Sequence, residues 1–174
     1  MKTIITLSFL CLALSSAIAQ EPATKKMLFD HLKESHNNNN WFVAVNSSLK
    51  NLTAEQAMWT DGTGNHSVGQ LAHHLLFWNE RILKGFKGEK VEQFTGNNTE
   101  TFDEFDSKQW SDVVSKLDKV LTELEEIVQN ASDKQLTEWA PTLVNISAHN
   151  AYHTGQIVIV RKQQGSWKAE YGVN

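Results

Sequence analysis

Two histidines late in the chain, His149 and His153, give the strongest chemical signal in the sequence. On a helix, their i, i+4 spacing puts both imidazoles on one face, with the Cβ atoms ~5–6 Å apart. Two imidazole nitrogens so placed can bind one metal ion at ~2.0–2.1 Å. Ile146, Ile157 and Val160 share that face, so we expect the pair to point inward. A buried imidazole needs a hydrogen bond or a metal, because an unpaired polar nitrogen is costly in apolar surroundings.

A third histidine, His74, lies on the apolar stripe of an earlier predicted helix, between Leu71 and Trp78. Histidines from two facing helices could form a three-nitrogen site with one coordination position left for water, which is typical of catalytic rather than structural zinc. Its neighbour His73 lies ~100° further around the helix and is expected on the flank. From spacing alone, satisfied or exposed histidines without a metal stay open as the alternative.

The remaining motifs exclude several kinds of site. The sequence contains no His-Glu-x-x-His, no Gly-x-Ser-x-Gly elbow and no phosphate loop. Cys11 is the only cysteine, which excludes a disulfide scaffold and a cysteine-ligated zinc site. His31, His36 and His66 are expected at the surface or at helix caps, and the acidic residues around Glu125 are expected on a solvated face.

The composition indicates one ordinary globular domain. The chain has 174 residues, of which 40% are hydrophobic and 21% charged, too apolar for a disordered protein. Its formal charge of −4 argues against binding to nucleic acid or to an anionic membrane. Six tryptophans indicate a large aromatic core or pocket.

The N-terminal segment is typical of a secretory signal peptide. Lys2 precedes an apolar stretch over 4–18, which is shorter than the ~20 residues that span a bilayer as a helix. Ala17 and Ala19 form a small-x-small cleavage signal before Gln20. We therefore expect residues 1–19 to be removed, leaving a secreted or periplasmic domain over 20–174 with no stable membrane anchor; an uncleaved anchor is the alternative.

Hydrophobic periodicity predicts four amphipathic helices, at about 23–49, 67–84, 108–129 and 146–164. Ser67 with Gln70 forms a capping-box pattern at the start of the second helix, and Thr53 with Gln56 does the same for a short turn. Residues 88–106 have no clear period, and a connection of this length could run along the whole bundle. The predicted fold class is therefore all-α, a four-helix bundle.

Two motifs resemble the DinB-like superfamily of metal-binding four-helix bundles: the stretch Ser67-Val-Gly-Gln-Leu-Ala-His-His-Leu-Leu-Phe-Trp78 and the later His149-Asn-Ala-Tyr-His-Thr-Gly-Gln-Ile157. The resemblance implies an up-down-down-up arrangement with a long crossover between the second and third helices. It implies a divalent metal, most often zinc or nickel, held by His74, His149 and His153 with water completing the shell. Some relatives transfer low-molecular-weight thiols, and others isomerise or hydrolyse small substrates. Asn150 departs from relatives that carry Asp there.

Two functions follow as hypotheses. The first is a metal-dependent hydrolase or transferase acting on a small molecule, without a clear carboxylate base. Its pocket is expected to be formed by aromatic walls and by amides that orient a polar substrate: Trp41, Trp78, Tyr152, Asn39, Asn40 and Gln156. The second is a non-catalytic extracytoplasmic protein that binds a metal or ligand, in which the metal is structural. An open coordination position beside a cavity would favour the enzyme, and a closed shell would favour the structural role. The sequence leaves a homodimer open.

Overall fold

The computed structural model describes residues 21–102 and 106–173. The predicted signal peptide lies outside these residues. Within them, no helix is both long enough and apolar enough to cross a membrane.

Four long helices confirm the predicted all-α bundle: α2 (Glu21–His36), α5 (Val68–Phe86), α6 (Trp110–Asn130) and α7 (Asp133–Gln163). Short helical segments join them or follow them: α3 (Val45–Leu49), α4 (Ala54–Met58), η1 (Asn98–Phe102), η2 (Ser107–Gln109) and η3 (Ala169–Tyr171). The described part of the chain contains no strand.

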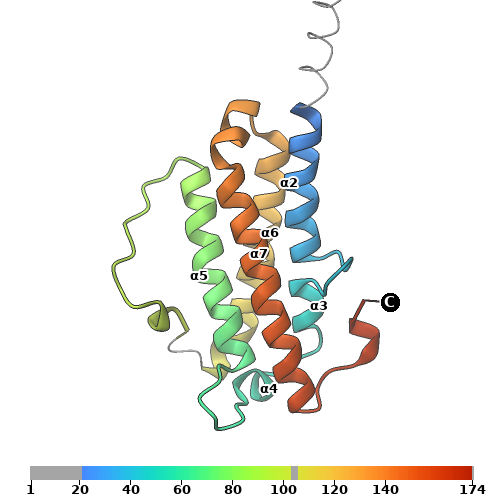
Figure 1. Cartoon of the computed structure of the whole chain (residues 1–174). Helices are drawn as coiled ribbons and strands as arrows, with labels where there is room; N and C mark the ends of the chain where they lie inside the picture. Colours follow the sequence, from blue (N-terminus) through green and yellow to red (C-terminus); the bar gives the residue numbers. More distant parts are fainter. Residues whose placement is uncertain (1–20, 103–105, 174) are drawn as a thin grey trace, which may run out of the picture.

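The helices pack in the expected up-down-down-up order. In Figure 1, α2 and α7 run in one direction and α5 and α6 in the other. Each long helix contacts two others, in the pairs α2–α6, α6–α5, α5–α7 and α7–α2. Because α5 and α6 are parallel neighbours, the chain must return along the bundle between them, and Figure 1 shows this long crossover beside α5.

The first helix is shorter than the periodicity predicts. It ends at His36 rather than near Leu49, and residues 45–49 form the separate helix α3. Asparagine is a poor helix former, since its amide competes for backbone hydrogen bonds. Asn39 does so here, because its side-chain oxygen accepts a hydrogen bond from the backbone N–H of Ala44.

The last helix is longer than predicted. It begins at Asp133 rather than at Ile146 and contains Pro141 in its interior. Proline removes one backbone hydrogen bond and usually ends a helix. Here Ser132 caps the helix, and the side chains of Leu136 and Leu143 on either side of the proline are buried, so tertiary packing carries the helix through it.

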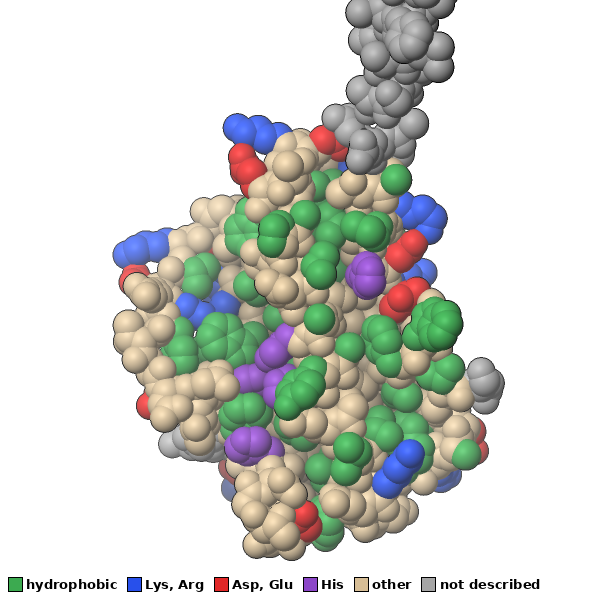
Figure 2. Space-filling model, in the orientation of Figure 1, with side chains coloured by type: hydrophobic (Ala, Val, Ile, Leu, Met, Phe, Trp, Pro, Cys, Tyr) green, Lys and Arg blue, Asp and Glu red, His purple; other side chains and the backbone are tan. Residues whose placement is uncertain are grey.

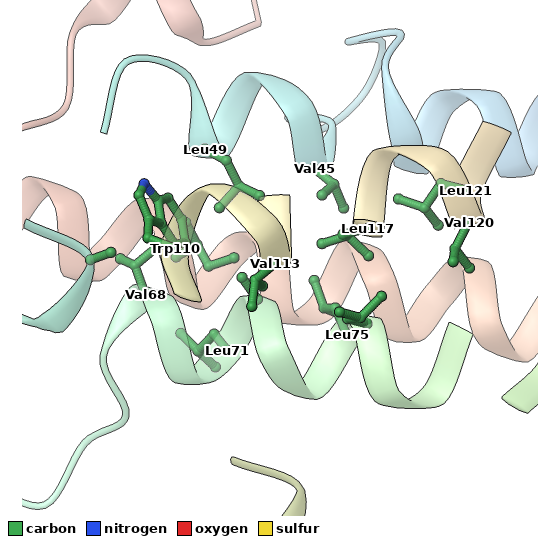
Figure 3. Close-up of a cluster of buried hydrophobic side chains, with 14 of the residues drawn as sticks. Val45, Leu49, Val68, Leu71, Leu75, Trp110, Val113, Leu117, Val120 and Leu121 are labelled. Atoms are coloured by element: carbon green, nitrogen blue, oxygen red, sulfur yellow. The ribbon is translucent and has the colours of Figure 1, made fainter. Parts of the chain in front are cut away.

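The core fixes the position of α5 relative to its neighbours. Figure 3 shows Leu71 and Leu75 of α5 facing Val113 and Leu117 of α6. The predicted capping box at Ser67 is present, and it sets the first residue of α5 and thereby the face on which each later residue lies. The second predicted capping box, at Thr53 in α4, is present as well.

Candidate metal centre

One group of side chains among the described residues could hold a metal ion, and it consists of His74, His149 and His153, here called the three-histidine cluster. His74 comes from α5, and the other two come from α7. One nitrogen from each imidazole lies within 4.8 Å of the others, and the Nε2 atoms of His74 and His149 are 3.0 Å apart. Ligands of a single ion at ~2.0–2.1 Å have separations on the order of 3–4 Å, so the cluster is close to a ligand set. Figure 2 shows histidine side chains gathered at the middle of this face, with hydrophobic side chains beside them.

The crossover holds the imidazole of His74 in place. Its Nδ1 lies 2.5 Å from the hydroxyl oxygen of Thr101, whose O–H donates to the carbonyl of Asn98 at 2.6 Å. Because that hydroxyl proton is already used, the oxygen accepts from Nδ1–H, and the lone pair of His74 is left on Nε2. The ring of Phe102 stacks on His74 at 3.9 Å between centroids. Thr101 and Phe102 therefore fix both the tautomer and the plane of the ring.

His153 is oriented in the same way, but from its own helix. The side-chain oxygen of Gln156 lies 2.6 Å from its Nδ1 and can only accept, so Nδ1 carries the proton and Nε2 the lone pair. The i, i+3 spacing on α7 brings the two side chains together.

His149 is not satisfied by the protein alone. Its buried Nδ1 has no hydrogen-bond partner within the described residues, and its Nε2 faces the Nε2 lone pair of His74. If the proton is on Nδ1, the two Nε2 lone pairs oppose each other at 3.0 Å. If it is on Nε2, the buried Nδ1 is an unpaired acceptor. A cation shared by the Nε2 atoms would remove the opposition of the lone pairs, so the residues fit a bound metal.

The cluster is held neutral, as metal ligands must be. Burial, followed by repulsion from His153 and His149, lowers the pKa of His74 to about 3. Burial, followed by repulsion from His153, lowers the pKa of His149 to about 4. Burial also lowers the pKa of His153 below its usual value, although the hydrogen bond that His153 donates to Gln156 acts in the opposite direction. Near neutral pH, protons therefore compete weakly with a metal for these nitrogens.

A cavity of about 740 Å³ opens beside the cluster. Trp78, Tyr152 and Gln156, three of the predicted pocket residues, line it. His66 and further side chains from α5, the crossover and α7 line it in addition to the predicted pocket residues: Ile82, Asn98, Phe102, Thr142, Asn145 and Ile146. Of these, Ile146 was expected on the inward face of its helix. Phe102 and Asn98 were missed because residues 88–106 have no periodicity to indicate a buried position.

The structure does not bring the other three predicted pocket residues to this cavity. Trp41 is 90% exposed on the segment after α2. Asn39 donates to the carbonyls of Tyr171 and Gly172, each at 3.1 Å, and so holds the C-terminal segment. Asn40 is exposed and donates to Glu34. All three lie in the segment between the end of α2 at His36 and the start of α3 at Val45.

The remaining histidines have separate roles. His73 is not one of the clustered histidines, and its Nδ1 lies 3.1 Å from the carbonyl oxygen of Thr101. His66 lines the cavity and stacks on Phe102 at 3.9 Å, while Ser67 caps α5. His36, expected at the surface, is buried and lies 2.5 Å from Glu125 and 2.9 Å from Asp118 on α6.

A buried amide pair joins α5 to α7 beside the cluster. Asn79 and Asn150 exchange two hydrogen bonds, of 2.8 and 3.1 Å, and both side chains are fully buried. Asn150 directly follows His149, so this pair fixes the register in which α7 faces α5. The Asn150 amide is thus used to pair the two helices.

A family model described as the DinB superfamily matches residues 43–157, a range that includes the whole three-histidine cluster. Neither the search of curated proteins nor that of solved structures gave a match.

Proposed function

Since the chain belongs to the DinB superfamily, we propose that the three-histidine cluster holds a divalent metal ion, zinc or nickel, and that the protein is a metal-dependent hydrolase or transferase acting on a small molecule. The observation that carries the proposal is the cavity, which meets the cluster directly. Three nitrogen ligands beside an open space are typical of a catalytic site, which keeps a coordination position free for water or substrate.

The residues around the cluster would have different roles in this function. Thr101 accepts a hydrogen bond from Nδ1–H of His74, and Gln156 accepts one from Nδ1–H of His153, which leaves the Nε2 atoms of both histidines free to bind a common ion. Trp78 and Phe102 form apolar walls that bind a substrate body and exclude water. When bound, a divalent ion would supply a Lewis acid that polarises a substrate oxygen and lowers the pKa of water.

Metal binding can be tested with four single variants. His74→Ala, His149→Ala and His153→Ala each remove a ligand, so each should greatly reduce the zinc or nickel bound per mole of protein. His73→Ala is the matched control, because His73 is adjacent to His74 but bonds to the crossover backbone. Every variant is first shown by circular dichroism to be helical. If His73→Ala loses the metal while His74→Ala retains it, or if all four retain it, the proposed site is wrong.

A non-catalytic role has one observation in its favour. Among the described residues, no carboxylate lines the cavity, so none of them supplies a carboxylate general base there. In that role the metal would mainly join α5 to α7. The two roles separate in one comparison of zinc-loaded and chelated protein: the enzyme turns over a panel of small esters, amides and thiol acceptors only when loaded, whereas the structural role changes thermal stability alone.

The proposal includes an extracytoplasmic location. It rests on the apolar segment and the small-x-small pattern within residues 1–19. The intact mass of the protein recovered from its native compartment should correspond to a chain that begins at Gln20. A mass that retains residues 1–19 would contradict this location.

A further inference from the structure

The described side chains that line the cavity beside the three-histidine cluster carry no fixed charge. Among the described residues, no Asp, Glu, Lys or Arg contributes to that lining. Arg81 lies on α5, but its guanidinium donates to the carbonyl of Glu92 and lies over the ring of Phe77 at 5.4 Å. The described part of the cavity wall therefore offers a ligand neither a fixed cation nor a fixed anion.

Three neutral imidazoles leave the charge of a divalent ion uncompensated. In a partly buried site, an uncompensated charge attracts an opposite charge more strongly than it does in water. Cationic ligands are disfavoured for the same reason. Polyanions such as nucleotides are disfavoured as well, because no Arg or Lys among the described residues lines the cavity to bind additional phosphates.

Uncommitted amide and hydroxyl groups lie in the same cavity. Within the described residues, no hydrogen bond of the protein uses the side chains of Asn98, Thr142 or Asn145, and all three line the cavity. Neutral N–H and O–H donors of this kind can bind the second oxygen of a single carboxylate. They orient an anionic group without adding charge.

The rest of the wall is apolar. Trp78 and Phe102 contribute aromatic rings, and Ile82 and Ile146 contribute aliphatic side chains. A volume of about 740 Å³ is ample for a ring with a short chain. The body of the ligand should therefore be a hydrocarbon, which gains affinity by leaving water.

We propose that the cavity binds monocarboxylates with an aromatic or aliphatic body, with the carboxylate toward the three-histidine cluster and the body against the wall formed by Trp78, Phe102, Ile82 and Ile146. This inference rests on the proposed function, since the attraction for the carboxylate requires the bound metal.

Calorimetry with three probes tests it: phenylacetate, acetate and benzylammonium. Phenylacetate should bind zinc-loaded protein at least tenfold more tightly than acetate, which lacks the apolar body. It should also bind loaded protein at least tenfold more tightly than chelated protein, while benzylammonium, which shares the ring, should not bind. Equal affinities for phenylacetate and acetate, or tighter binding of benzylammonium, would overturn the proposal.

Two pairs of variants locate the ligand. Asn145→Asp adds a negative charge at the cavity with almost no change of shape and should weaken phenylacetate binding at least fivefold. Asn38→Asp makes the same change at an exposed site outside the cavity and should have no effect. Ile82→Ala removes part of the apolar wall and should weaken phenylacetate binding about fivefold or more. Val144→Ala, which lies on α7 outside the cavity, should leave phenylacetate binding unchanged. If the members of either pair behave alike, the ligand is not in this cavity.

The metal content of the same samples separates this inference from the proposed function. If the protein takes up no zinc, the proposed function itself is wrong. If it takes up zinc but binds phenylacetate no better than acetate, the metal site stands and the ligand class is wrong.

Discussion

Thr101→Val is the most informative single change at the cluster, because it removes the hydroxyl that bonds to His74 with almost no change of side-chain shape. Valine has nearly the shape of threonine but lacks the hydroxyl, and the Thr101 side chain is only 2% exposed, so water cannot easily replace the lost oxygen. The variant leaves Nδ1–H of His74 and the carbonyl of Asn98 without their partners at 2.5 and 2.6 Å.

The size of the effect follows from these contacts. Losing a partner that orients a metal-bound histidine typically weakens metal affinity 10–100-fold, or about 1.4–2.8 kcal/mol. The unpaired buried donor should also destabilise the metal-free fold by roughly 1–3 kcal/mol. Both losses should come from the missing hydroxyl, so Thr101→Ser, which retains it, should stay close to wild type in metal affinity.

A competition titration against a chromophoric zinc chelator near neutral pH measures the affinity, and thermal unfolding of the chelated protein measures the stability. Thr99→Val is the matched control, since Thr99 lies exposed on the same short helix η1. If Thr101→Val and Thr99→Val bind zinc equally tightly, Thr101 does not orient His74, and the assignment of the free lone pair to Nε2 loses its basis.

Three further predictions concern buried polar groups. Burial lowers the pKa of His36, but its hydrogen bonds to Glu125 and Asp118 outweigh that effect and leave the pKa raised. The stabilisation of the fold by charged His36 is therefore complete below about pH 6.5 and is lost as pH rises through the raised pKa of His36. The difference in melting temperature between wild type and His36→Gln should narrow at alkaline pH; a constant difference would contradict this. Asn150→Leu should lower the free energy of unfolding in urea by roughly 1–3 kcal/mol, because it leaves the buried side-chain oxygen of Asn79 without its donor, while the Asn79 amide still donates to the carbonyl of Leu75. Adding Asn79→Leu should recover part of that loss; strictly additive losses would argue against the pair. In the three-histidine cluster the pKa values of the folded protein are lowered, to about 3 for His74 and about 4 for His149. The folded protein therefore loses stability as pH falls below about 6.5, and protons displace the metal from these nitrogens. The difference in melting temperature between zinc-loaded and chelated protein should close on acidification, and a difference that persists would show that these histidines do not hold the ion.

Local spacing in the sequence was enough to predict much of the bundle. Helical periodicity identified α5 and α6 to within about two residues of the observed ends, since their apolar faces are continuous and are not interrupted by proline. Capping boxes depend on residues three apart, so those at Ser67 and Thr53 were also readable from the chain. The pairing of His149 with His153 was predictable for the same reason, because an i, i+4 separation fixes two side chains on one face whatever surrounds the helix.

Predictions from the sequence were wrong where packing between distant segments outweighs the local conformational or burial preference of a residue. Proline disfavours a helix interior, but buried leucines on both sides of Pro141 keep α7 continuous. His36 and Glu125 are both polar and read as surface residues, yet α2 and α6 bury them against each other at 2.5 Å. The local sequence around a polar residue does not reveal whether a hydrogen-bond partner on another helix will allow it to be buried.

In the three-histidine cluster, some features were predictable from local sequence and others depend on the tertiary structure. The apolar stripe of α5 selected His74, and the DinB-like motifs selected the same residue, but only the packing of α5 against α7 brings its Nε2 to 3.0 Å from that of His149. Thr101 reaches His74 from 27 residues away along the chain, through a crossover without periodicity. The ligand types and their spacing on each helix are local properties of the chain. Their common point, the tautomers and the cavity beside them depend on contacts between segments far apart in sequence, and those exist only once the bundle has closed.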